Sequence, residues 1–118
     1  MSSSVPPRRI ASNWLWRDGR LSRDPLVELS ADGSLLSCAR CETPDREPFT
    51  EFYAGVLVAG FPSDWRGAFE WLRARRERPL AELLAALPRP DAGGVWVLLS
   101  GLDYASMRLT DSSRIRLL

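Results

Sequence analysis

Histidine and lysine are both absent from this 118-residue chain, so all sixteen of its basic residues are arginine. Without an imidazole, the chain cannot assemble the ligand sets that most often hold a catalytic zinc ion. Fifteen acidic residues leave a net charge of +1, which gives no bulk attraction to nucleic acid or to an anionic membrane. The composition therefore predicts neither a histidine-based metal enzyme nor a nucleic-acid-binding protein.

Long apolar runs are also missing, because no stretch approaches the ~20 residues that a membrane-spanning helix needs. The first residues, MSSSVPPRRIAS, lack the apolar segment of a signal peptide. The two cysteines of a chain that is not exported are expected to stay reduced. We therefore expect a cytoplasmic protein with no membrane partner. A hydrophobic fraction of 45% with five tryptophans indicates one small folded domain.

Short segments rich in aliphatic and aromatic residues predict five strands and a short sixth. In the first of them, alternation places Ile10 on the same face as Trp14 and Trp16. Asp32 and Gly33 predict a tight hairpin turn. The predicted strands cover residues 9–16, 25–29, 34–39, 52–61, 94–100 and 114–118.

Two helices are predicted between the fourth and fifth strands. Asp64 can cap a helix that runs from Trp65 towards Arg78, and Pro79 suits the first turn of a second helix. The second helix carries an apolar stripe with helical spacing, formed by Leu80, Leu83, Leu84 and Leu87.

These elements predict an α+β fold: a small β-sandwich or partly open barrel of five to six strands, with two helices packed on one side. Residues 1–8 are predicted to be a flexible tail. Residues 9–118 are predicted to form a single composite β-sandwich domain, in which 64–88 is a helical insert.

Two pieces of the chain resemble the two ends of one amidohydrolase branch, the cytosine-deaminase-like and chlorohydrolase-like proteins. Residues 9–61 contain RIASNWLW, PLVELSADGSLLS and EFYAGVLVAGF, which are similar to the N-terminal hairpins of that branch. Residues 69–118 contain FEWLRARRERPLAELLAAL and GVWVLLSGLDYASMRLTDSSRIRLL, which are similar to its late helices and its C-terminal strand and tail. In that family the flanks form a small β-sandwich beside a (β/α)₈ barrel. The resemblance implies that residues 62–67 join the flanks here and that the catalytic barrel is missing.

The resemblance carries over no catalytic residue. In the family a His-x-His metal motif follows Gly-Phe, whereas Gly60 and Phe61 lead here into Pro62. The resemblance therefore implies a non-enzymatic module, without cofactor or metal, that acts by protein–protein contact. The implied partner is a second copy, giving a homodimer, or a full-length amidohydrolase. The alternatives are a small ligand-binding domain, an accessory subunit that completes an enzyme complex, and a decayed gene with no selected role.

Aromatic residues supply the candidate partner-binding surface. If a barrel once covered part of this domain, the surface left behind would be apolar and would favour self-association or another partner. Core packing is the competing interpretation of the same side chains. The candidate partner-binding residues are Trp14, Trp16, Phe61 and Trp65.

Cys38 and Cys41 form a single CxxC motif, which is the weak candidate for a metal-binding pair. One such pair is half of a tetrahedral zinc site, so a homodimer would have to supply the other half. A redox role would need a helix start in a βαβ setting, which the pattern does not predict. We prefer a structural interpretation of these cysteines and assign no metal site.

Overall fold

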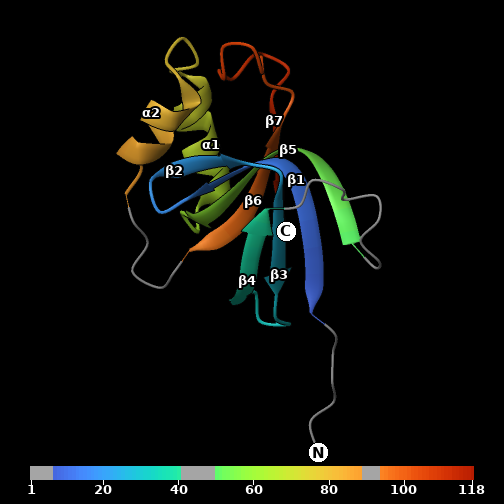
Figure 1. Ribbon diagram of the computed structural model, residues 1–118. Helices are drawn as coiled ribbons and strands as arrows, with labels where there is room; N and C mark the ends of the chain where they lie inside the picture. The colour runs from blue at the N-terminus through green and yellow to red at the C-terminus, as the bar shows by residue number, and fades with distance from the viewer. Residues whose placement is uncertain (1–6, 41–49, 89–93) are drawn as a thin grey trace, which may run out of the picture.

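The computed structural model describes residues 7–40, 50–88 and 94–118 (Figure 1). Within these ranges the chain forms seven strands and two helices, which confirms the predicted α+β class. The helices are α1 (Trp65–Arg73) and α2 (Leu80–Ala86). The strands are β1 (Arg8–Arg17), β2 (Arg20–Arg23), β3 (Pro25–Leu29), β4 (Leu35–Arg40), β5 (Thr50–Phe61), β6 (Val95–Ser100) and β7 (Arg114–Leu117).

All seven strands belong to one mixed sheet that is not closed into a barrel. Its order is β4-β3-β1-β5-β6-β7, and β2 pairs with β1 beyond the end of β3. The β1–β5 ladder is parallel, whereas the other ladders are antiparallel. The strand that the sequence did not predict is β2, and β1 begins at the last residue of the predicted tail. Residues 1–6 of that tail lie outside the described residues.

A register irregularity between β1 and β5 changes which face the side chains of β1 occupy, because Asn13 lies opposite two residues of β5, Ala54 and Gly55. The register against β5 shifts between Ser12 and Trp14, and the Asp24 amide donates to the Asn13 carbonyl at 2.9 Å where β2 gives way to β3. As a result, Ile10 packs in a different apolar cluster from Trp14 and its neighbour Trp16. The prediction that these side chains share one face is wrong, because the alternation of side chains in β1 breaks at this irregularity.

Two apolar cores lie on opposite faces of the sheet, and consecutive residues of β5 point into one or the other. The helix-side core consists of Val56, Val58, Phe61, Phe69, Leu72, Leu80, Leu83, Leu84, Val97, Leu99, Leu102 and Leu109. The opposite core consists of Ile10, Leu15, Val27, Leu29 and Leu57. Both helices supply the helix-side core, as expected from the prediction that they pack on one side.

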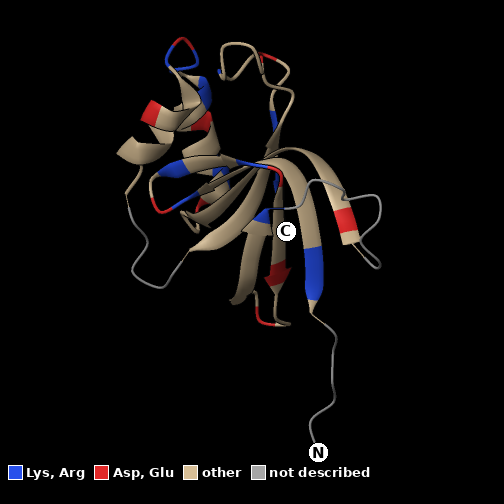
Figure 2. Ribbon diagram, viewed as in Figure 1, with Lys and Arg blue, Asp and Glu red and all other residues tan. Residues whose placement is uncertain are grey.

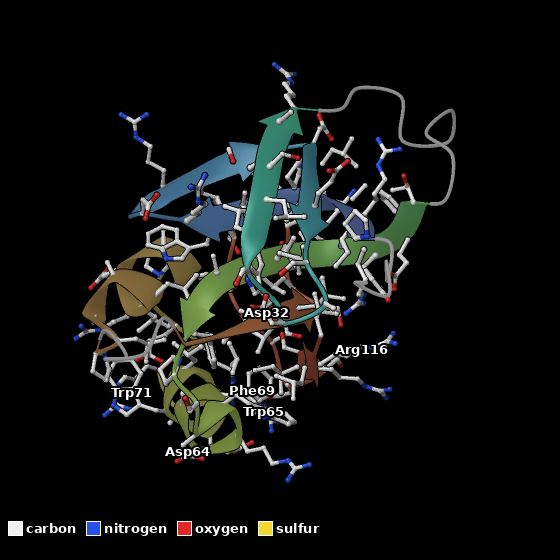
Figure 3. All side chains as sticks on the ribbon, turned by 90° about the horizontal axis from the view of Figure 1, so that it is seen from below. Asp32, Asp64, Trp65, Phe69, Trp71 and Arg116 are labelled. Carbon is white, nitrogen blue, oxygen red and sulfur yellow. The ribbon has the colours of Figure 1, made fainter. Side chains whose placement is uncertain are left out.

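The sheet curls around the opposite core. Leu35 from β4 and Trp96 from β6 both pack against this core, although two other strands and β5 lie between them in the sheet. In Figure 3, β3 and β4 accordingly cross over β5. The sheet is therefore barrel-like in its curvature but open at its edges.

The first helix is shorter than predicted. It starts where expected, since the Asp64 carboxylate accepts a hydrogen bond from the Gly67 amide at 3.2 Å. It ends at Arg73, after which the Arg75 amide bonds to the carbonyl three residues back, that of Leu72, at 3.0 Å. Such tighter turns close a helix that cannot continue into Pro79. Neither described helix is long and apolar enough to cross a membrane.

Candidate binding site

A hollow of about 330 Å³ opens between α2, the end of β5 and the turn that joins β1 to β2. Its volume is within the range of small-molecule and side-chain binding pockets. It contains two of the four predicted partner-binding residues, Trp16 and Phe61. We call it the Trp16 hollow, and it is lined by Trp16, Asp18, Gly19, Val58, Ala59, Gly60, Phe61, Pro62, Leu84, Ala85, Leu87 and Pro88.

The strand ladders explain why the hollow forms at this place. Trp16 lies opposite Val58 in the parallel β1–β5 ladder, and both side chains pack in or against the helix-side core. The ladder between β5 and β6 shifts register after Val58, and Gly60 has a φ of 66°, a left-handed conformation that suits glycine. The bulge turns Phe61 into the helix-side core, where it is 1% exposed. The floor of the hollow is therefore fixed by buried packing.

Arginines cover three other tryptophans. The guanidinium carbon of Arg23 lies 4.6 Å from the ring centroid of Trp14, and that of Arg66 lies 4.6 Å from Trp65. The guanidinium carbon of Arg75 lies 4.1 Å from the ring centroid of Trp71. Such cation–π contacts shield the face of an indole and stabilise it by about 0.5–1 kcal/mol at exposed sites.

The four predicted partner-binding residues therefore do not form one patch. Trp14 lines a separate hollow with Tyr104, whereas Trp65 lies at the start of α1. Figure 3 places Trp65 and Phe69 on one side of α1 and Trp71 on the other. All four pack in or against the helix-side core, but only Trp16 and Phe61 line the same hollow. Strand alternation could not predict this, since it depends on the bulge in β5 and on the packing of α2.

The rim of the Trp16 hollow has one charged lining residue, Asp18. Its carboxylate lies 3.6 Å from the Arg17 guanidinium, and its side chain is 84% exposed. Asp18 lies in the turn between β1 and β2. Leu84 and Leu87 belong to the apolar stripe predicted for the second helix, and they both pack in or against the helix-side core and line the hollow.

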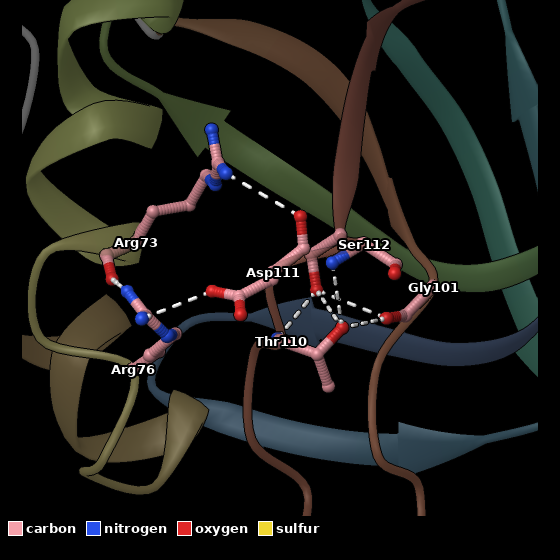
Figure 4. A network of polar contacts seen from close by, with 7 residues as sticks. Arg73, Arg76, Gly101, Thr110, Asp111 and Ser112 are labelled. Atoms are coloured by element: carbon pink, nitrogen blue, oxygen red, sulfur yellow. Dashed lines mark hydrogen bonds and ion pairs between the residues drawn. The ribbon is translucent and has the colours of Figure 1, made fainter.

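Two arginines at and after the end of α1 contact Asp111. Arg76 lies 2.9 Å from the Asp111 carboxylate, and Arg73 donates to the Asp111 carbonyl at 3.4 Å (Figure 4). Thr110 and Ser113 both donate from their hydroxyls to the Gly101 carbonyl, at 2.8 and 3.0 Å, and so hold the same loop. This network ties the end of α1 to the β6–β7 loop, and we interpret it as structural.

A second charged network lies at the far end of the sheet, where Figure 2 shows basic and acidic segments side by side on β1 and β5. Arg8 donates twice to Glu51, at 2.9 Å from Nε and from Nη2, and the Tyr53 hydroxyl donates at 2.6 Å. The Arg8 and Tyr53 hydrogen bonds lower the pKa of Glu51 to about 2. Glu51 raises the pKa of Tyr53, and Arg116 stacks on that ring at 4.9 Å.

The described part of the chain contains no group of three or more histidine, cysteine, aspartate or glutamate residues that could hold a metal ion. Cys38 is exposed and has a free thiol, whereas its predicted partner Cys41 lies outside the described residues.

Comparison with known proteins finds no match among protein-family models, curated proteins or solved structures. The resemblance to amidohydrolase flanks thus rests on the sequence segments alone.

Proposed function

We propose that this chain is a non-catalytic interaction module, derived from the β-sandwich flanks of an amidohydrolase, that acts by protein–protein contact. The observation that carries the proposal is the Trp16 hollow, where an indole faces an open apolar site while three other tryptophans lie beneath arginines. Tryptophan in a pocket is the side chain that most often anchors a protein interface.

The ladder between β5 and β6 supports the derivation from two flanks. It pairs Val56 with Leu99 and Val58 with Val97, so the two amidohydrolase-like pieces share one sheet and one core. Joining the flanks through a short connection requires that they already lie side by side.

The chemistry of the hollow indicates what part of a partner it accepts. Its floor is apolar, and its one charged lining residue is the acidic Asp18. An apolar side chain next to a lysine or arginine would bury its body against Trp16 and place its cation near Asp18. We therefore propose a partner protein that presents such a pair.

A small-molecule ligand is the second candidate function. It is favoured by the position of the hollow between a helix and the sheet, which is typical of ligand sites, and by its volume of about 330 Å³. A ligand of this kind would have an apolar body and an amine.

The test is site-specific photo-crosslinking in cells that produce the chain. A photoreactive residue replaces Ala85, which lines the hollow, or its neighbour Ala86, which is also exposed but does not line it. We expect position 85 to give a cross-linked protein, identified by mass spectrometry, that position 86 does not give and that Trp16→Ala removes.

Two other results would reject the proposed contact function or replace it. If positions 85 and 86 label the same proteins equally, the contact function is rejected. If position 85 labels no protein but native mass spectrometry finds a small molecule that Trp16→Ala releases, the ligand-binding alternative replaces it.

A further inference from the structure

Three strands of the described sheet have an edge without a neighbouring strand: β2, β4 and β7. Such edges can pair with another chain, and proteins commonly protect them with charged residues. Both β2 (RLSR) and β7 (RIRL) contain two arginines in four residues. The sequence of β4, LLSCAR, has its single charge at the last position (Figure 2).

This difference matters most for pairing between two copies of the chain. An antiparallel pair of β2 strands, or of β7 strands, would place four arginines along a ladder of four residues, and like charges across a ladder are destabilising. An antiparallel pair of β4 strands would place its two arginines at opposite ends. The charges therefore oppose self-pairing at two edges and permit it at the third.

A bulge at the start of β4 limits the part of this strand that can pair with a second copy. Glu28 lies opposite Ser37 and Leu29 opposite Leu35, so Leu36 is the extra residue of a bulge, and its side chain is 57% exposed. A bulge is itself a protection at an edge, but this one occupies only the start of β4. From Ser37 onwards the register with β3 is regular.

We propose that β4 pairs antiparallel with β4 of a second copy, about a two-fold axis at Cys38. In this register Ser37 lies opposite Ala39 of the other copy, so small side chains meet at the centre. Arg40 lies opposite Leu36, and the aliphatic part of the arginine can cover that exposed leucine. A parallel pair would instead bring the two Arg40 side chains together.

The pairing is independent of the Trp16 hollow, whose lining residues include none from β4. It would join two seven-stranded sheets into one continuous sheet. The proposed partner is therefore an identical chain, which supplies an extended strand with small, uncharged side chains at its centre, residues 37–39.

The test uses analytical ultracentrifugation of the purified chain in reducing buffer over a range of concentrations. We expect a monomer–dimer equilibrium. Cys38→Arg and Cys38→Glu, each at an exposed position, should be monomeric alone because like charges then meet at the axis, whereas an equimolar mixture should dimerise. Leu117→Arg, a matched charge on the exposed β7 edge, should leave the dimer intact.

The register is tested by oxidative cross-linking in a Cys41→Ser background. Mild oxidation should join two chains through Cys38. When the single cysteine is moved to position 37 or 39 in a Cys38→Ser chain, the yield should fall at least tenfold, since neither position meets itself across the axis.

A wild-type chain that stays monomeric at every concentration overturns this inference, as does a dimer that Cys38→Arg leaves intact. An equal cross-linking yield at positions 37, 38 and 39 overturns the register. These outcomes are separate from the proposed contact function, which is read from the photo-crosslink at position 85.

Discussion

Single side chains of this protein show what arginine contributes that lysine would not. A guanidinium is planar and weakly hydrated, so it can lie flat on an aromatic ring while its edges donate hydrogen bonds. Arg75 does both, since it stacks on the Trp71 ring and donates to the Trp71 carbonyl at 3.0 Å. Arg116 also lies over an aromatic ring, that of Tyr53. In a chain without lysine, arginine thus covers aromatic rings that would otherwise face water.

The charged network at Glu51 predicts a dependence of stability on pH. The folded protein lowers the pKa of Glu51 from 4.5 to about 2, chiefly through the Arg8 hydrogen bonds and then through Tyr53. A lowered pKa means that the network stabilises the fold fully above about pH 4.5 and that this contribution is lost as the pH falls towards 2. We expect Glu51→Gln to be less stable than wild type near neutral pH, with a difference that shrinks on acidification.

Urea unfolding across this pH range measures the difference, with Glu77→Gln as the control at an exposed glutamate after α1. A difference between wild type and Glu51→Gln that stays constant down to about pH 2 would contradict the assignment.

At the scale of secondary-structure elements, the sequence predicted a helix start or a hairpin correctly where residues next to each other in the chain determine it. Asp64 marks the start of α1, and Asp32 with Gly33 marks the hairpin between β3 and β4. The prediction of side-chain alternation in β1 failed because it depends on the neighbouring strand β5. The irregularity at Asn13 involves β5, which places two residues opposite Asn13 and whose Gly55 amide donates to the Asn13 side-chain oxygen at 2.9 Å. No pattern within residues 8–17 contains that information.

The close packing of β5 against β6 at Gly55 predicts the effect of a substitution on stability. It has a φ of 141°, and a methyl group added there would overlap the Leu99 carbonyl oxygen of β6. Gly55→Ala should therefore lower the free energy of unfolding by at least roughly 1–3 kcal/mol, the cost of a strained backbone conformation. Gly33→Ala is the control, because its φ of 85° is also positive but no atom lies within 4 Å of the added methyl. Equal unfolding midpoints for the two variants would show that the close approach of β5 and β6 is relaxed in solution.

At the scale of the whole molecule, β5 joins the two cores. Leu57 is buried in the opposite core, whereas Val56 and Val58 are buried in the helix-side core. The sequence predicts a strand over residues 52–61, of which residues 55–58 and Phe61 are buried. It does not predict that the two cores lie on opposite faces, because this depends on the order of strands in the sheet.

The shared strand predicts one cooperative unfolding transition. Leu57→Ala in the opposite core and Leu83→Ala in the helix-side core should each cost roughly 2–5 kcal/mol, since both leucines are almost fully buried. Near-UV and far-UV circular dichroism should report coincident transitions for both variants. If Leu83→Ala loses its near-UV signal before its far-UV signal and Leu57→Ala does not, the helices form a separate unit.

The parallel ladder between β1 and β5 has a consequence for synthesis on the ribosome. β1 can pair locally with β2 and β3 as soon as these emerge, but its other side waits for β5, where Asn13 and Gly55 are 42 residues apart. Until then the nascent hairpin exposes the side of β1 that becomes the centre of the sheet. Contacts between distant residues form slowly, and an unpaired apolar strand is prone to aggregate. We therefore expect the nascent chain to be most prone to aggregation between the emergence of residue 17 and that of residue 61.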